Sequence, residues 1–290
     1  MDLLESAFQK LRDVPENFDG SIATVVFDDS VDVLVYCCVL YVLLVFVVPE
    51  YVMKNRAPLN LRLPFILWNL TLCVFSILGA MSCVALLTFL VNDRGFYRTT
   101  CFFDKELIFN GKYAFWVFYF VLSKIPEMLD TAFLVFQKKP VIFLHWYHHL
   151  TVMLFCWHAH VTRISSGLWF ATMNYCVHSI MYFYYFVCAC GLRKIIRPIA
   201  PLITMLQILQ MVVGTFIALY TCIQRLTHPR GCDTNDTSIR LGLMMYASYL
   251  FLFARFFVDR YYTSPSRSVK RVVNRAIALE MERAKSLKGA

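Results

Sequence analysis

The sequence predicts an all-α protein that crosses a membrane several times, and three observations lead to this fold class. Hydrophobic residues make up 59% of the 290 positions and charged residues only 16%, whereas soluble domains hold about 45–50% and about 25%. The mean hydropathy is +0.58. Seven apolar stretches come close to the ~20 residues that a membrane-spanning helix needs. We therefore expect one domain of seven transmembrane helices.

The seven stretches follow one another with short polar connections. The residues before the first stretch are acidic and lack the basic start and short apolar core of a signal peptide, so the first stretch is expected to remain as a span. The turns 138–140 and 165–167 delimit the fourth and fifth stretches, which contain many His and Tyr residues. The expected spans are 31–49, 65–91, 114–136, 140–160, 168–190, 199–223 and 240–262.

The distribution of Lys and Arg gives an orientation for these spans. With residues 1–30 on the lumenal side, 16 of the 28 basic residues face the cytosol and 10 face the lumen, as the positive-inside rule requires. Residues 31–262 then form the transmembrane domain, and residues 263–290 form a basic cytosolic tail. The net charge of +9 follows from these loops and this tail and does not indicate nucleic acid, since no groove-reading motif is present.

Two features of the expected lumenal loops agree with this orientation. Asn235-Asp236-Thr237 is a glycosylation sequon in the loop before the last span. Cys101 and Cys232 fall in two loops where oxidation can occur. Spacing alone leaves a disulfide and two free thiols as equal alternatives.

Ionisable residues inside spans are costly and usually mark function, and the third span holds three of them. Lys124, Glu127 and Thr131 are spaced i, i+3 and i+7 on one helix face, and Asp130 is beside them. Pro126 lets this helix bend and frees a carbonyl. A structural ion-pair network that locks helices together is an equal alternative for Lys124 and Glu127.

The fourth span contains three histidines on one turn, His145, His148 and His149. A single buried histidine is usually a hydrogen-bonded core residue, but three on one turn indicate a functional cluster. Polar residues at helical spacing continue into the next two spans, although helix-to-helix hydrogen bonding explains the Tyr and Gln residues equally well. They are Asn174, His178, Tyr182 and Tyr185 in the fifth span and Gln207 and Gln210 in the sixth. At similar depth, these groups can share one cavity that opens toward the cytosol.

Two kinds of chemistry use such a cluster. Membrane di-iron desaturases and hydroxylases bind metal with several histidine boxes, but this chain has seven histidines and a single HxxHH box, so no metal is expected. Acyl transfer is the second kind, because imidazole titrates near neutral pH and can act as a nucleophile or a general base. An apolar tunnel would hold the acyl chain, and cytosolic Lys and Arg would meet the phosphates of a carrier such as CoA.

Four segments together carry a family resemblance. SKIPEMLDT (123–131), LHWYHHLTV (144–152), MNYCVHSIMYFYY (173–185) and TMLQILQ (204–210) resemble the fatty-acid elongases of the endoplasmic reticulum, over about residues 50 to 265. Within this family the chain looks most like the subfamily acting on saturated and monounsaturated chains. The resemblance implies six of the seven helices around a closed-ended acyl tunnel, and condensation of acyl-CoA with malonyl-CoA to a 3-oxoacyl-CoA, CO₂ and CoA. It also favours the Cys101–Cys232 disulfide.

The resemblance implies a role for each site residue. His148 is the expected nucleophile, forming an acyl-imidazole, and His178 faces and assists it. His145 and His149 orient the pair or support decarboxylation, while Asn174 and Gln207 bond the thioester or enolate oxygens. The remaining substrate-binding residues are Lys124, Glu127 and Asp130 at the cytosolic entrance, with Lys124 within reach of a CoA phosphate, and Tyr182, Tyr185 and Gln210. Arg255 either binds CoA phosphate or pairs with Asp259.

No cofactor is expected beyond the substrates acyl-CoA and malonyl-CoA. The resemblance places the chain in the endoplasmic reticulum membrane, among membrane lipid and beside the reductases and dehydratase of the elongation cycle, and Lys285 and Lys288 give weak support as a dilysine-like signal. The sequence leaves a homodimer open. A seven-helix receptor and a transporter are the rival readings, but a receptor does not explain three histidines on one turn, and a transporter often shows repeats or broken helices.

Overall fold

The computed structural model of the chain describes residues 14–103 and 109–263. The first 13 residues of the expected lumenal segment lie outside the described residues, and so does the expected basic tail beyond Thr263. The described part is all-helical and contains no strand. The predicted all-α class is therefore confirmed for this part of the chain.

The helices differ widely in length, and three of them pass directly into π-helical segments. These segments are η1, η3 and η5, whereas η2 and η4 are short 3₁₀ turns. In chain order the elements are α2 (Ser21–Asp28), α3 (Val31–Val42), η1 (Leu43–Val52), α4 (Arg62–Cys101), α6 (Gly111–Ser123), η2 (Pro126–Met128), α7 (Leu129–Phe136), α8 (Phe143–Val161), α9 (Gly167–Val187), η3 (Cys188–Leu192), α10 (Arg193–Ile196), η4 (Arg197–Ile199), α11 (Ala200–Thr227), α12 (Asp236–Phe257) and η5 (Val258–Tyr262).

Four helical stretches of the described residues are long and apolar enough to cross a membrane. They are Val31–Val52, Arg62–Cys101, Gly167–Thr227 and Asp236–Tyr262. Gly191, with a φ of 100°, interrupts the third stretch, which therefore contains both α9 and α11. Several long apolar helices are the mark of a multi-pass membrane protein. The number seven remains a prediction, because α6–α7 and α8 are not among these four stretches.

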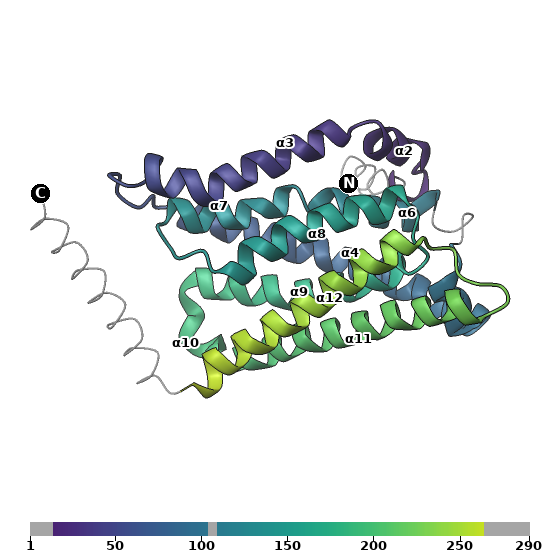
Figure 1. The fold of residues 1–290 in the computed structure, drawn as a ribbon. Coiled ribbons are helices and arrows are strands. Elements are labelled where there is room, and N and C mark those ends of the chain that lie inside the picture. The colour runs from purple at the N-terminus through teal and green to yellow at the C-terminus, as the bar shows by residue number, and fades with distance from the viewer. Residues whose placement is uncertain (1–13, 104–108, 264–290) are drawn as a thin grey trace, which may run out of the picture.

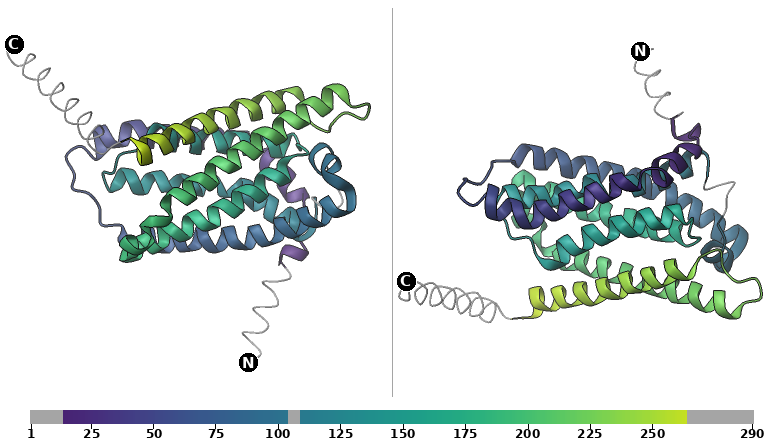
Figure 2. Two further views of the ribbon diagram at one scale, coloured as in Figure 1. Left: turned by 90° about the horizontal axis from the view of Figure 1, so that it is seen from below. Right: turned by 45° about the horizontal axis from the view of Figure 1, so that its top comes forward.

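The long helices lie side by side along roughly one direction (Figure 1). Helix α4 packs along α9, and α11 packs along α12. Helix α3 with η1 lies at an outer edge of the bundle, against α8 and α7 (Figure 2). Helix α8 contacts α2, α3, α6 and α12, so the segment that carries the three histidines is enclosed by other helices. Helix α2 and segment η5 lie at opposite ends of the bundle (Figure 1), which we call the α2 end and the η5 end.

Two glycines allow the closest helix contacts. A Cβ atom added at Gly79 of α4 would lie 2.5 Å from the ring of Tyr175 on α9, and one at Gly214 of α11 would overlap the ring of Tyr246 on α12. Small residues at such positions let helices approach closely, which is how helices associate in a membrane. The two helix pairs α4–α9 and α11–α12 are thus fixed by a glycine facing a tyrosine.

The third predicted span bends where the sequence places its proline. Helix α6 ends at Ser123, a 3₁₀ turn runs over Pro126–Met128, and α7 begins at Leu129. Proline lacks the backbone N–H needed to continue an α-helix. The hydroxyl of Ser123 donates to the carbonyl of Phe120 over 2.8 Å, which satisfies one acceptor at the break. The bend turns the polar residues of this segment toward α9.

Candidate active site

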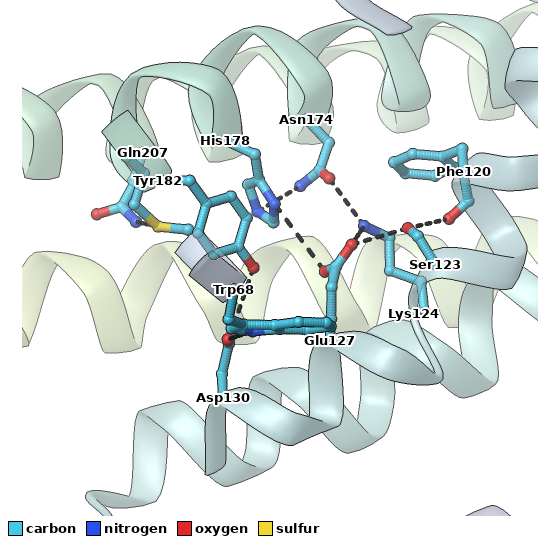
Figure 3. Close-up of polar contacts among 11 residues, drawn as sticks. Trp68, Phe120, Ser123, Lys124, Glu127, Asp130, Asn174, His178, Tyr182 and Gln207 are labelled. Carbon is cyan, nitrogen blue, oxygen red and sulfur yellow. Dashed lines mark hydrogen bonds and ion pairs between the residues drawn. The ribbon is translucent and has the colours of Figure 1, made fainter. Parts of the chain in front are cut away.

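The first part of the site is a buried ion pair at the bend between α6 and α7. Lys124 and Glu127 are only 2% and 3% exposed, and the Lys124 Nζ lies 2.8 Å from the Glu127 Oε1. The hydroxyl of Ser123 shares its single proton between this oxygen and the Phe120 carbonyl, each 2.8 Å away, and the ring of Phe120 lies 4.3 Å from the ammonium. A buried charge needs a partner and hydrogen bonds, and this pair has both (Figure 3).

The pair continues into Asn174 and His178, one turn apart on α9. The Lys124 Nζ donates to the Asn174 Oδ1 over 3.1 Å, and the Asn174 Nδ2 lies 3.1 Å from the His178 Nε2 (Figure 3). Because an ammonium can only donate, it fixes which end of the asparagine amide faces His178. The amide then donates to the His178 Nε2, so a neutral His178 carries its proton on Nδ1. That nitrogen lies 4.0 Å from the Glu127 Oε2.

Asp130 forms a second polar centre that connects three helices. The Trp68 Nε1 of α4 donates to one carboxylate oxygen over 2.7 Å, and the Tyr182 hydroxyl of α9 donates to the other over 2.9 Å (Figure 3). Both acceptors of Asp130 thus have partners from neighbouring helices. Tyr182 is 1% exposed, and its ring centroid lies 5.4 Å from that of His178.

The three histidines of α8 point in two directions. His145 shares a 2.9 Å hydrogen bond with Thr131, and its ring centroid lies 4.6 Å from that of His149. The His148 ring instead lies 4.9 Å from the ring of Tyr249 on α12. The i, i+4 pair therefore shares one face of α8, while His148 faces α12.

All three histidines line one chamber of about 350 Å³. The chamber lies between α4, α7, α8, α9, α11 and α12, and ten residues predicted from the sequence line it. They are Asp130, His145, His148, His149, Asn174, His178, Tyr182, Tyr185, Gln207 and Gln210.

A narrower cavity of about 100 Å³ continues from the chamber toward the α2 end. His148, Asn174, Gln210 and Met211 line both spaces, so the two meet at this level. Apolar side chains from α6, α8, α9 and α12 form most of the wall of the narrower cavity. The site is thus a histidine-lined chamber beside a narrower, mostly apolar cavity, and His148 lies in the wall of both.

Three predicted site residues lie outside the chamber wall. Lys124 and Glu127 were expected at the cytosolic entrance; both are buried, and Lys124 donates to Asn174. The physical reason is that Pro126 turns this face inward, where the two charges pair. Arg255 is exposed on α12, lines neither cavity, and has its Nε 3.7 Å from Asp259 Oδ2, which favours the ion-pair alternative.

Several residues of the site escaped sequence reasoning. Trp68, Tyr41 and Tyr249 each place a polar atom against the polar residues of α7 or α8. Trp68 and Tyr41 lie in spans with no other sign of function, and Arg255 is the one candidate in the span of Tyr249, so nothing in the sequence pairs the three with Asp130, Thr131 or His148. Their amphipathic character is the single signal, because a buried Tyr or Trp usually has a hydrogen-bond partner.

The two loop cysteines and the asparagine of the predicted sequon lie at the α2 end. A disulfide joins Cys101 to Cys232, and the N–H of Asp233 donates to the Cys101 carbonyl over 2.6 Å. Asn235 is the N-cap of α12, where its Oδ1 accepts from the Ser238 N–H over 2.6 Å. Among the residues that the structure describes, no group of His, Cys, Asp and Glu is arranged to hold a metal ion.

Comparison with known proteins identifies one matching family and several similar relatives. The profile of the ELO, or GNS1/SUR4, family matches residues 26–269. The chain is 69% identical over 261 residues to a very long chain fatty acid elongase 4 of Trypanosoma cruzi (strain CL Brener), covering 90% of this chain and 91% of that protein. It is 53% identical to a fatty acid elongase 3 of the same organism, covering 85% and 89% of the two chains.

A fatty acid elongase 3 of Trypanosoma brucei brucei (strain 927/4 GUTat10.1) is 51% identical to this chain, with coverage of 86% and 90%. The similarity therefore extends over nearly the full length of each relative. It includes the polar segments of α7, α8, α9 and α11 that form the chamber. On the family match and these relatives, the chain belongs to the ELO (GNS1/SUR4) family.

Proposed function

We propose that this protein is the condensing enzyme of fatty-acid elongation. It joins a long-chain acyl-CoA to malonyl-CoA and releases CO₂ and CoA, and the product is a 3-oxoacyl-CoA two carbons longer. The observation that carries this proposal is that His148 lies in the wall of both a histidine-lined chamber and an adjoining, mostly apolar cavity. The elongase names of the relatives support the same reaction.

In the first step the unprotonated ring nitrogen of His148 attacks the thioester carbonyl. The C–S bond breaks, CoA leaves as a thiol after taking a proton, and the acyl group stays on His148 as an acyl-imidazole. His149 and His178 line the same chamber and provide the proton transfers. The acyl chain lies in the apolar cavity, where its methylene groups are removed from water.

In the second step malonyl-CoA loses CO₂ to give the enolate of acetyl-CoA. The enolate carbon forms the new C–C bond to the acyl carbonyl, the C–N bond to His148 breaks, and the released nitrogen takes up a proton through the neighbouring histidines, which restores the imidazole. Gln207 is suited to bind a substrate oxygen, because among the described residues its Nε2 donates to the Met181 sulfur alone, over 3.4 Å. Sulfur is a weak acceptor, so a thioester or enolate oxygen competes well for that donor.

The network around Asn174 positions the assisting histidine. Glu127 and Lys124 are buried behind it, fix the asparagine amide, and thereby set the tautomer of His178. Substrate contact falls to residues that line the chamber. Asp130, Tyr182, Tyr185 and Gln210 form its wall beside His148 and are assigned to substrate binding.

Seven transmembrane helices with a lumenal N-terminus fit this function. Helix α2 and segment η5 lie at opposite ends of the bundle, as an odd number of crossings requires. The residues lining the two cavities come from α4, α6 with α7, α8, α9, α11 and α12, besides the α2 region, two loops at that end and Ile142 just before α8. None comes from α3 or η1. This supports six helices around the acyl tunnel, with α3 outside.

The same proposal places the protein in the endoplasmic reticulum membrane, surrounded by lipid. The C-terminus is cytosolic, and the reductases and dehydratase that complete the cycle act as neighbours. Saturated and monounsaturated acyl-CoAs are the proposed substrates. A homodimer is compatible with the exposed apolar faces of α3 and α11, although lipid covers such faces equally well.

Intact-protein mass spectrometry tests the mechanism. Purified protein is incubated with a long-chain acyl-CoA and no malonyl-CoA, with wild type and His148→Ala side by side. We expect one added acyl mass on the wild type alone, mapped to His148 by peptide sequencing. His145→Ala serves as the matched control, because it removes a histidine from the same turn and should still acylate.

Two other outcomes lead to different conclusions. Without an adduct, but with labelled CO₂ released from malonyl-CoA when both substrates are present, the elongase function stands and His148 does not act by stable acyl transfer. Without either signal from protein shown to be folded, the proposed function fails.

A further inference from the structure

At the α2 end, part of the wall of the apolar cavity comes from the residues before the first long helix. From His148 it follows α8 as far as His160, a distance of roughly 18 Å at about 1.5 Å per residue. At that level Phe18, Gly20 and Ala23 complete its wall. We call residues 18–28, which include α2, the closing segment.

The closing segment is fixed to the helices around it. The Gly20 N–H donates to the Asn110 Oδ1 over 2.8 Å, and the Gly111 N–H donates to the Phe18 carbonyl over 2.9 Å. A Cβ atom at Gly20 would overlap the carbonyl of Phe109, so the backbone itself packs against the α4–α6 loop. At the other end of the segment Phe27 is fully buried, and the Trp157 Nε1 donates to its carbonyl over 3.1 Å. These contacts make the segment a rigid wall.

The lining also changes its chemistry at this point. Between His148 and Ala159 the side chains along α8 that line the cavity are apolar, whereas Asp28, His160 and Arg163 line its last part. Asp28 and Arg163 carry charge, and an alkyl chain that extended past Ala23 toward them would gain little from burial. The apolar part of the lining therefore ends where the closing segment completes the wall.

We propose that the closing segment is the stop for the methyl end of the acyl chain, and that Ala23 and Phe18 set the longest chain this enzyme elongates. This inference rests on the proposed condensing activity. Ala23 is 6% exposed and lines the cavity, whereas Val25 on the same helix is 60% exposed and does not. The two positions provide a matched pair, because the same added bulk falls inside the tunnel at one and outside it at the other.

The test compares full-length wild type, Ala23→Leu, Val25→Leu and Phe18→Ala. Each purified protein receives malonyl-CoA and a series of saturated acyl-CoAs that differ by two carbons, and the 3-oxoacyl-CoA products are measured by mass spectrometry. We expect Ala23→Leu to turn over the shorter acyl-CoAs normally and to lose about tenfold on the longest substrate of the wild type, since one two-carbon unit can no longer be buried. Val25→Leu should keep the wild-type profile. Phe18→Ala should accept a substrate one unit longer.

The outcomes separate this inference from the proposed function. If Ala23→Leu slows all chain lengths equally, or if neither Ala23→Leu nor Phe18→Ala moves the length limit, the stop lies elsewhere and the inference is overturned. If Ala23→Leu does not fold, Phe18→Ala alone decides, because it removes bulk and must raise the limit. If wild type itself gives no 3-oxoacyl-CoA at any length, the proposed function has failed instead.

Discussion

At the residue scale, the buried pair of Lys124 and Glu127 is held by contacts on both sides. Glu127 accepts from Lys124 and Ser123, and Lys124 donates onward to Asn174. In a low-dielectric interior the two charges stabilise each other, and removing one leaves the other uncompensated. The pair is therefore both a structural requirement and the group that orients Asn174 toward His178.

Glu127→Leu should destabilise the protein by about 3–5 kcal/mol, because it leaves the Lys124 ammonium buried without a counter-charge. The double variant Lys124→Met with Glu127→Leu should regain most of that stability, since both charges are gone. Thermal unfolding in detergent, followed by size-exclusion chromatography, measures both effects.

Activity separates the two roles of the pair. We expect the stable double variant to remain poorly active, because Asn174 has lost the donor that fixes its amide. Full activity in the double variant would show that the network serves stability alone.

Asp130 permits a second test among single residues. Trp68 and Tyr182 both donate to its carboxylate, and an asparagine at this place has one acceptor oxygen instead of two. Asp130→Asn should therefore leave one buried donor unpaired at a cost of about 1–3 kcal/mol. Adding Tyr182→Phe removes that donor and should restore much of the loss in thermal stability. If the stability losses of Asp130→Asn and Tyr182→Phe simply add in the double variant, Trp68 and Tyr182 do not compete for the remaining acceptor oxygen.

At the scale of helices, hydropathy located helical segments well and the helix ends poorly. The first and last predicted spans share a boundary with the structure, at Val31 and Tyr262. The second was predicted over 65–91, yet α4 runs over Arg62–Cys101. Hydropathy records where a helix leaves the apolar layer, whereas backbone hydrogen bonding continues the helix into polar surroundings. For the same reason α2, which is short and lies among acidic residues, was not predicted.

In the site, contacts within one helix could be predicted from the sequence, whereas contacts between helices could not. Spacing on one helix correctly paired His145 with His149 and Asn174 with His178. It gave no means of finding that Trp68 meets Asp130 or that Tyr41 meets Thr131, because each contact depends on how two helices rotate against each other. That rotation is set by packing features such as Gly79 against Tyr175, which a single sequence does not disclose.

The α11–α12 pair offers a prediction at this scale. Gly214→Ala places a methyl group where the ring of Tyr246 lies, so the helices must move apart, at a cost of about 1–3 kcal/mol in the free energy of unfolding. Gly167→Ala is the matched control, since its nearest neighbour would be Ile164 at an ordinary 3.6 Å. Thermal unfolding of the two variants under one detergent condition makes the comparison. If Gly214→Ala and Gly167→Ala are equally stable, the α11–α12 contact can accommodate a methyl group without separating the helices.

At the scale of the whole molecule, the orientation in the membrane decides which end of the bundle receives the substrates. The chamber lies nearer the η5 end, and the closing segment lies at the α2 end together with the Cys101–Cys232 disulfide and the sequon at Asn235. A lumenal α2 end places the chamber on the cytosolic side, where CoA substrates are available. It also exposes the disulfide to an oxidising compartment.

Glycosylation at Asn235 reports this orientation, provided that the variant used leaves α12 intact. The Asn235 side chain caps that helix, and loss of such a cap costs about 1 kcal/mol, so Asn235→Gln would mix two effects. Thr237→Ala removes the sequon and keeps the cap. Asn235→Asp also abolishes glycosylation while retaining a capping oxygen.

In microsomes we expect the wild-type protein to shift in mobility on endoglycosidase treatment. Both variants should run unshifted at the deglycosylated position, with normal thermal stability. If an Asn235→Cys variant is instead labelled from the cytosolic side of intact microsomes by a membrane-impermeant maleimide, the α2 end is cytosolic, and the proposed route of substrates into the chamber must be reversed.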